Sequence, residues 1–263
     1  MNVLAGIVQQ KDIEVHAMKK SGGLPIERVR APLSLSQALR RGQDDPLRLL
    51  CEHKRRSPSA GALSTVLSPA ARASIYAEGG AAAISVLTDS HFFDGGFDQL
   101  SAIHRALHAA GFAVPLLAKD FVIHETQIDA AFAAGADAVL LIARILSPAR
   151  MHALYSYARR LGLEPLVEVH GQAETDHARA MEAWVVGVNA RDLDTLEMDT
   201  AAAQEVLASL EPEIVGVHLS GLKNADDVRE VAAGPAAAAL IGECLMRQDD
   251  PRALLAALRL ACV

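Results

Sequence analysis

The sequence is poor in aromatic residues and in cysteine. Phe, Trp and Tyr make up 4% of the 263 residues, and alanine dominates the apolar ones, which favours closely packed helices over a β-sandwich. The three cysteines, Cys51, Cys244 and Cys262, are odd in number and widely spaced, which argues against a disulfide framework and against a zinc site. We expect Cys51 and Cys244, which lie inside apolar runs, to be small core residues.

The sequence also lacks an excess of basic charge and a long apolar run. Its net charge is −7, so the surface offers no broad positive field for nucleic acid. The basic run Lys54–Arg56 is either a solvated loop or part of a site. The amino terminus has too short an apolar stretch for a signal peptide, and no later run approaches a membrane span. We therefore expect a soluble, cytoplasmic protein that binds neither nucleic acid nor a membrane.

Eight short apolar runs recur along the chain, each followed by a helical pattern. The runs are almost continuously apolar, as expected of parallel strands that are covered on both faces. They are Leu47–Lys54, Ala82–Asp89, Pro115–Phe121, Asp137–Ile145, Glu164–His170, Trp184–Ala190, Glu213–Gly221 and Ala238–Met246.

The segments between these runs have the ends that helices usually have. Ser68-Pro69 and Ser147-Pro148 are predicted helix starts, and Gly79 and Gly162 are predicted helix stops. Eight strand–helix units in about 250 residues predict an α/β protein, a (β/α)₈ TIM barrel. A doubly wound open sheet is the alternative. It is less favoured because "EHKRRSPSAG", which ends the first run, is not a glycine-rich phosphate fingerprint.

The first 46 residues precede the first predicted strand. They contain "NVLAGIVQQKDIEVHAMKKSGG" and "SLSQALRRG", which predict one or two extra helices. We expect residues 1–46 to form an N-terminal helical extension packed on a barrel of residues 47–263, giving a single domain overall. The extension either plugs the bottom of the barrel or folds over its top as part of the substrate pocket. Position in the sequence does not distinguish the two.

Charged residues gather at the carboxyl ends of the predicted strands, where barrel enzymes have their active sites. Because alternate strand residues face the same side, Glu52 and Lys54 share a side, and so do Glu168 and His170. With Lys119 of "PLLAKDF", two lysines and two glutamates converge on one mouth. Such groups shift one another's pKa values, which suits general acid–base chemistry. Other polar strand-end residues are Thr88, Asp89, Asp120, Arg144, Asn189, Arg191, Asp192 and His218.

The last two predicted strands end in glycine-containing loops. Ser220-Gly221 and Gly242-Glu243 fall where barrels commonly bind phosphate. Glycine lets backbone N–H groups approach an anion, and the positive end of a following helix favours negative charge. The sequence therefore predicts a phosphate-bearing ligand.

Several strings together resemble one family. "CEHKRRSPSAG", "ISVLTDSHFFDG", "LLAKDFVI", "LVEVH", "VGVNARDLDTLEMD" and "LIGECLMR" are similar, in this order, to indole-3-glycerol phosphate synthase of tryptophan biosynthesis. The resemblance implies a carbon–carbon lyase. It would close the ring of 1-(2-carboxyphenylamino)-1-deoxyribulose 5-phosphate and remove CO₂ and water to give indole-3-glycerol phosphate. It also implies no cofactor, no metal, and a monomer or weak homodimer.

The resemblance also implies roles for the charged residues. Lys119 would be the general acid that protonates the ribulose carbonyl oxygen. Lys54 would hold the substrate carboxylate or act as a second acid in dehydration. Glu168 would be the general base, and Glu52 would position or polarise Lys119. Which lysine serves which step stays open.

Further residues would bind the substrate if the resemblance holds. Asn189 would bond the hydroxyl groups and Arg191 would organise the carboxylate side. The expected phosphate site comprises Ser57, Ser220, Gly221 and Gly242, with Glu243 beside it. Phe93 and Leu117 would sandwich the aromatic ring.

One position departs from the family pattern. Where that pattern reads A-E-S-G, this chain has His218-Leu219-Ser220-Gly221, so a carboxylate is replaced by leucine. The change either lowers activity, by the 10²–10⁴ typical of one acid–base group, or marks a divergent paralogue acting on a related phosphorylated anthranilate-type ketose. A Schiff-base aldolase with Lys119 or Lys54 as nucleophile is another alternative. So is a non-catalytic phosphate-ligand-binding barrel, although the retained lysines and glutamates argue against it.

Overall fold

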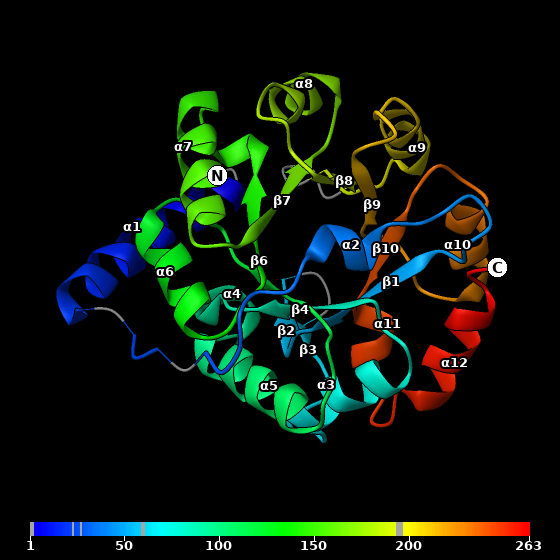
Figure 1. The fold of residues 1–263 in the computed structure, drawn as a ribbon, viewed down its shortest axis with the longest axis horizontal. Coiled ribbons are helices and arrows are strands. Elements are labelled where there is room, and N and C mark those ends of the chain that lie inside the picture. Colours follow the sequence, from blue (N-terminus) through cyan, green and yellow to red (C-terminus); the bar gives the residue numbers. More distant parts are fainter. Residues whose placement is uncertain (1–2, 23, 27, 59–60, 193–196) are drawn as a thin grey trace.

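The protein is a closed barrel of eight parallel strands surrounded by helices (Figure 1). The computed structural model describes residues 3–22, 24–26, 28–58, 61–192 and 197–263. Around the barrel the strands follow the order β1-β10-β9-β8-β7-β6-β5-β4. They are β1 (Arg48–His53), β4 (Ala83–Leu87), β5 (Leu116–Lys119), β6 (Ala138–Ile142), β7 (Glu164–Val169), β8 (Val185–Asn189), β9 (Val215–Leu219) and β10 (Ala238–Ile241). Each lies inside one predicted run, so the TIM-barrel prediction is confirmed and the open sheet is wrong.

A helix follows every barrel strand and packs outside it. These are α3 (Pro69–Glu78), α5 (Phe97–Ala109), α6 (Glu125–Ala133), α7 (Pro148–Arg160), α8 (Gln172–Ala180), α9 (Thr200–Ala208), α10 (Ala225–Ala232) and α12 (Arg252–Leu260). Both predicted Ser-Pro starts are confirmed. The Ser68 hydroxyl accepts a hydrogen bond from the backbone N–H of Ala71, and the Ser147 hydroxyl accepts one from that of Arg150.

The strand ends differ from the prediction where the chain leaves the barrel. Ala143–Ile145 forms a 3₁₀ turn, η1, and Glu243–Met246 forms the short helix α11, although both segments were predicted as strand. A short helix α4 (Ser90–Phe93) follows β4, and β2 (Arg56–Ser57) pairs antiparallel with β3 (Gly61–Ala62). Apolar composition alone does not mark these ends, because the rim residues are buried as well.

The apolar side chains form two layers that alternate along each strand. Leu49 and Cys51 of β1 pack outward against the helices, whereas Leu50 points into the barrel interior. On β5, Leu117 likewise belongs to the interior layer. Two residues further along each strand, the inward positions are Glu52 and Lys119, and β7 repeats the pattern. The alternation therefore places charged groups directly above an apolar floor, at the carboxyl end of the barrel.

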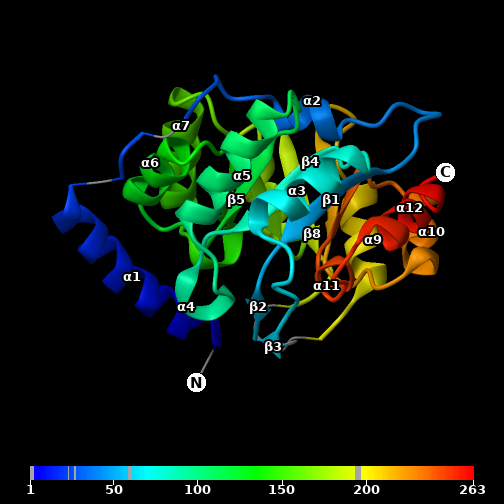
Figure 2. The same cartoon turned by 90° about the horizontal axis from the view of Figure 1, so that it is seen from below.

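The N-terminal extension occupies both ends of the barrel. Helix α2 (Leu35–Leu39) buries Leu35 and Leu39 completely in the interior layer and closes the amino end. Helix α1 (Val3–Ser21) reaches the other end, where Leu4 and Ile7 line a cavity. Figure 2 shows α2 at one end of the molecule and the first turns of α1 at the other, on the side of α4. Helix α2 thus lies at the end of the barrel where a plug was expected, and helix α1 lies at the end that the other alternative named.

Candidate active site

A cavity of about 410 Å³ opens at the carboxyl ends of the strands. Twelve of the thirteen predicted site residues line it. Those on or next to the first six barrel strands are Glu52, Lys54, Ser57, Phe93, Lys119, Glu168, Asn189 and Arg191. Those after the last two strands are Ser220, Gly221, Gly242 and Glu243. The structure thus brings together residues that lie up to 191 positions apart in the sequence, from Glu52 to Glu243.

Leu117 is the predicted residue that does not line this cavity. It is completely buried in the barrel interior, below Lys119 on the same strand. Phe121 lines the cavity instead, and its ring centroid lies 6.2 Å from that of Phe93 at an interplanar angle of 36°. Phe121 was not predicted, although its place two positions after Lys119 in "PLLAKDF" was a signal for it.

Glu52 and Lys54 form a close ion pair at the end of β1. Lys54 Nζ lies 2.7 Å from Glu52 Oε1, and the carboxylate is buried. Burial by itself would raise the pKa of Glu52, but the nearby ammonium groups of Lys54 and Lys119 outweigh it and lower that pKa. Glu52 is therefore ionised at neutral pH. A Cβ atom at Gly242 would lie 2.5 Å from Glu52 Oε1, so the glycine leaves room for this carboxylate.

Lys119 and Glu168 face each other across the cavity floor, with Lys119 Nζ 3.8 Å from Glu168 Oε2. The Asn189 side-chain amide donates to Glu168 Oε1 at 2.9 Å, and the Arg191 backbone N–H donates to Asn189 Oδ1 at 3.0 Å. Within the described residues, Glu168 Oε2 is buried and accepts no hydrogen bond. One carboxylate oxygen is therefore fixed, and the other is available to a reacting group.

Part of the cavity lining is a turn with cationic neighbours. Ser220 and Gly221 have φ values of 70° and 90°, so the chain turns sharply after β9 in a conformation that favours glycine at the second position. Lys223 and Arg247 also line the cavity, and Arg247 pairs with Glu243 at 2.8 Å. Sequence reasoning missed both cations. A phosphate group favours nearby positive charge. The basic residues that follow the two glycine-containing loops in the sequence were therefore a signal for both cations.

Several other polar residues at the strand ends lie outside the cavity. His170, which was expected on the same side of its strand as Glu168, follows the end of β7 at Val169 and is not in the cavity lining, and its ring donates to the Asn189 carbonyl at 2.8 Å. Arg144 pairs with Asp192 at 2.7 Å and with Glu174 at 2.9 Å. His218 is buried on the outward side of β9, and burial lowers its pKa. These residues support the rim.

A second hollow, of about 880 Å³, lies at the start of β1 between α3 and α12. It is away from the strand ends that carry the paired lysines and glutamates, so we assign chemistry to the smaller cavity. Across the residues that the structure describes, no group of three or more His, Cys, Asp or Glu side chains is arranged to hold a metal ion. Among the described helices, none has the length and apolarity needed to cross a membrane.

A parallel barrel whose carboxyl rim gathers ammonium and carboxylate groups in one cavity defines a class, the TIM-barrel enzymes that perform acid–base chemistry. The family model for indole-3-glycerol phosphate synthase matches residues 4–258. The chain belongs to this family.

Named relatives agree with this assignment over most of the chain. An indole-3-glycerol phosphate synthase from Opitutus terrae is 40% identical over 228 residues, which cover 87% of this chain and 85% of that protein. One from Exiguobacterium sibiricum is 39% identical over 251 residues, covering 95% and 94% of the two chains.

Solved structures are similar in fold at lower identity. A 3-hexulose-6-phosphate synthase has a TM-score of 0.65 at 18% identity, covering 82% of this chain and all of that one. Thiamine phosphate pyrophosphorylase from Pyrococcus furiosus has a TM-score of 0.62 at 20% identity, covering 82% and 95%. These likenesses support the barrel fold.

Proposed function

We propose that this protein is a carboxy-lyase that converts 1-(2-carboxyphenylamino)-1-deoxyribulose 5-phosphate into indole-3-glycerol phosphate, CO₂ and water. The observation that carries the proposal is the convergence of the pairs Lys54–Glu52 and Lys119–Glu168 in one cavity with Ser220 and Gly221. The reaction needs a proton donor, a proton acceptor and an anion site together, and this cavity has candidates for all three.

We assign ring closure to Lys119. Its ammonium would protonate the ribulose carbonyl oxygen while the ring carbon that carries the carboxylate attacks the carbonyl carbon. Loss of CO₂ from that carbon then restores the aromatic ring. Lys119 extends from a barrel strand paired on both sides, which favours accurate placement of its ammonium. The Lys119 ammonium also acts on the buried Glu52, whose pKa it helps to lower.

We assign dehydration to Lys54 and Glu168. Lys54 would protonate the departing hydroxyl group so that it leaves as water. Glu168, through its unbonded Oε2, would take the proton released as the new double bond forms. Asn189 holds the other oxygen of Glu168, so the base has a fixed orientation. In this assignment Lys54 also balances the substrate carboxylate before CO₂ leaves.

We assign the two ends of the substrate to the two ends of the cavity. Phe93 and Phe121 would contact the aromatic ring, because they supply the aromatic surface of the lining. Ser57, Ser220, Gly221 and Gly242 would surround the phosphate. Lys223 and Arg247 supply positive charge to the same lining, and Arg191 would stand beside the carboxylate.

The proposal is tested by incubating the purified protein with the anthranilate-derived ribulose phosphate and following indole fluorescence. Wild type should turn over, and Lys119→Ala should lose about 10²–10⁴ in kcat. An unchanged rate in Lys119→Ala would remove the acid assignment. No turnover by wild type would remove the proposed substrate, and recovery in Leu219→Glu would point to a paralogue with a related substrate, because Leu219 is a buried apolar part of the lining.

We also propose a cytoplasmic location and a monomer or weak homodimer. The substrate class supports the location, and the monomer is supported by the cavity, which takes both lysine–glutamate pairs from the same chain. Cell fractionation and light scattering over a range of concentrations would check these two expectations.

A further inference from the structure

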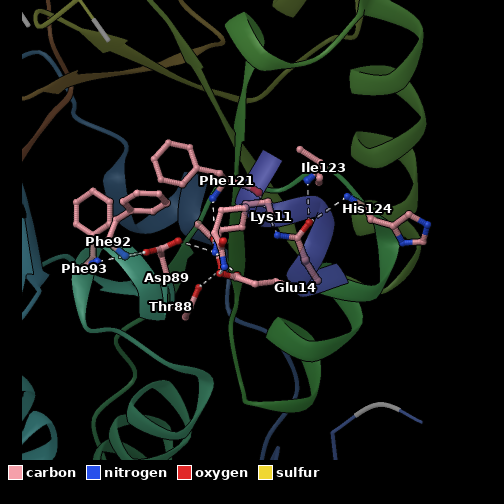
Figure 3. Close-up of polar contacts among 12 residues, drawn as sticks. Lys11, Glu14, Thr88, Asp89, Phe92, Phe93, Phe121, Ile123 and His124 are labelled. Carbon is pink, nitrogen blue, oxygen red and sulfur yellow. Dashed lines mark hydrogen bonds and ion pairs between the residues drawn. The ribbon is translucent and has the colours of Figure 1, made fainter. Parts of the chain in front are cut away.

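Lys11 is a buried cation in the middle of α1. Its side chain is 1% exposed, and its Nζ lies 2.6 Å from Asp89 Oδ2, 2.7 Å from Asp120 Oδ1 and 2.7 Å from Glu14 Oε2 (Figure 3). Glu14 belongs to the same helix, whereas Asp89 and Asp120 follow barrel strands β4 and β5. The two barrel carboxylates are 0% and 5% exposed, so a single ammonium from the N-terminal extension serves both.

Asp89 also controls the orientation of Phe93. Its Oδ1 accepts hydrogen bonds from the backbone N–H groups of Phe92 at 2.6 Å and Phe93 at 3.2 Å, and so caps α4. Its other oxygen is the one that Lys11 contacts. Fixing this carboxylate therefore fixes the short helix from which Phe93 reaches the cavity.

Asp120 has the matching position beside Phe121. Its Oδ1 accepts from the backbone N–H of Phe121 at 2.8 Å, and its Oδ2 accepts from the Thr88 hydroxyl at 3.0 Å. Asp120 follows Lys119 directly in the chain. The Lys11 ammonium thus joins two carboxylates, each of which holds one ring of the pair Phe93–Phe121.

The same face of α1 reaches the cavity. Positions 4, 7 and 11 recur at helical spacing, so Leu4, Ile7 and Lys11 lie on one side of the helix. Leu4 and Ile7 line the cavity, while Lys11 bonds to the barrel. Attachment of this helix therefore adds apolar surface next to the aromatic residues.

We propose that Lys11 is a positioning residue for the aromatic end of the substrate: through Asp89 and Asp120 it holds Phe93, Phe121 and the apolar face of α1 in the arrangement that binds the ring. The inference rests on the proposed function, because it concerns that substrate's aryl group. It assigns binding rather than chemistry to Lys11, since Lys119 and Glu168 are held separately by the paired strands.

The charges favour a permanent contact. Burial by itself would lower the pKa of Lys11, but Asp120 and Asp89 outweigh it and raise that pKa, so the ammonium stays charged across the working range. Burial raises the pKa of Asp120, Lys11 opposes this, and Asp89 adds to it. Without Lys11, two neighbouring buried carboxylates would face each other, and the hydrogen bonds that they accept from the backbone of Phe93 and Phe121 would weaken.

The experiment compares Lys11→Met with Arg30→Met, using the same fluorescence assay. Arg30 is a matched control, because it also joins the N-terminal extension to a buried carboxylate, with 2.7 Å from its Nη1 to Asp137 Oδ1 at the opposite end of the barrel. Lys11→Met should raise KM about tenfold or more and change kcat by less than about threefold. Arg30→Met should lower the unfolding temperature without raising KM. Inhibition by inorganic phosphate should be unchanged in both variants.

If Lys11→Met does not fold, Lys11→Met/Asp120→Asn removes one unpaired carboxylate and is compared with Asp120→Asn alone, with the same expected rise in KM. An unchanged KM in the folded Lys11 variant would overturn the inference while leaving the proposed function intact. An equal rise in KM for Arg30→Met, or weaker inhibition by phosphate, would overturn it too, since the effect would then be general. A wild-type protein that does not turn over would overturn both proposals.

Discussion

Two buried carboxylates at opposite ends of the barrel, Asp137 and Glu168, differ in how completely they are bonded. At the amino end, Asp137 precedes β6 and is completely buried. Its Oδ1 accepts from Arg30 Nη1 at 2.7 Å and from the Leu33 backbone N–H at 2.9 Å, and its Oδ2 accepts from Arg30 Nη2 at 2.7 Å and from the Leu116 backbone N–H at 2.8 Å. Glu164, at the start of β7, is also bonded through both oxygens.

At the carboxyl end, Glu168 is just as buried but only half bonded. Asn189 holds one oxygen, and the other lies 3.8 Å from Lys119 Nζ. A fully bonded carboxylate stabilises the folded chain and has no lone pair left for chemistry. A partly bonded carboxylate contributes less to stability and can take a proton. Unsatisfied bonding capacity therefore distinguishes Glu168 from Asp137 and Glu164, and also from Asp89 and Asp120, which are bonded through both oxygens at the same end of the barrel.

The largest expected effect is on the rate. Glu168→Gln keeps the shape and the hydrogen bond with Asn189 but removes the base, so kcat should fall by about 10²–10⁴. The unfolding temperature should stay the same or rise, because a buried, partly bonded charge is removed. Steady-state fluorescence kinetics and thermal unfolding monitored by circular dichroism measure the two quantities. If Glu168→Gln kept most of the activity, Glu168 would not be the general base, and its unbonded oxygen would have no role in the reaction.

The next effect is on stability at the other end. Asp137→Ala leaves the Arg30 guanidinium and two backbone N–H groups without their acceptor, and should lower the free energy of unfolding by about 3–5 kcal/mol. The kcat of the molecules that remain folded should be unchanged. Urea unfolding and activity measured at low temperature check this. A fall in kcat at full folding would show that the two ends are coupled.

A third effect concerns acid sensitivity. Burial lowers the pKa of His53 from 6.5 to about 4, so this side chain stays neutral in the folded protein while the unfolded chain takes up a proton. The neutral His53 side chain contributes about 3 kcal/mol to the free energy of unfolding. This contribution is fully present above pH 6.5 and is lost as the pH falls towards 4. His53→Leu should therefore flatten the dependence of unfolding free energy on pH. His104, whose pKa burial also lowers to about 4, should preserve part of the slope. An unaltered slope would contradict the assignment.

The smallest effect is expected at the cap of α2. The Ser34 hydroxyl accepts from the Gln37 backbone N–H at 3.1 Å and donates to Glu164 at 2.8 Å. Ser34→Ala should cost about 1 kcal/mol of stability and leave KM and kcat unchanged. Chemical denaturation resolves a change of this size. A loss of activity here would weaken the distinction between the two ends.

Much of the fold was predictable, because parallel strands leave a strong mark on the sequence. The eight runs, the Ser68 and Ser147 caps, and the positions of Lys54 and Lys119 at strand ends all follow from local pattern and alternation. The count of eight strand–helix units pointed to a closed barrel, and so to the pairing of distant strands, which no single local pattern specifies. Leu117 was misplaced because its apolar character fits both a barrel interior and a ring contact.

The remaining site residues were hidden for physical reasons. Lys11 lies in an amphipathic helix where a lysine normally faces solvent, and its burial depends on Asp89 and Asp120, more than seventy positions away. Lys223 and Arg247 follow the loops that contain Gly221 and Gly242, and the phosphate prediction was based on those two glycines. Their contribution depends on how each loop turns, and single-sequence patterns do not specify that.

Gly242 carries a consequence for protein engineering. Its missing methyl group is the space that the Glu52 carboxylate occupies, so even alanine, the smallest replacement, would displace that side chain and with it the contact to Lys54. A mutational library that varied every ionisable residue but left the glycines alone would overlook this position. The Glu52–Lys54 contact thus requires glycine at position 242, a residue that has no functional group of its own.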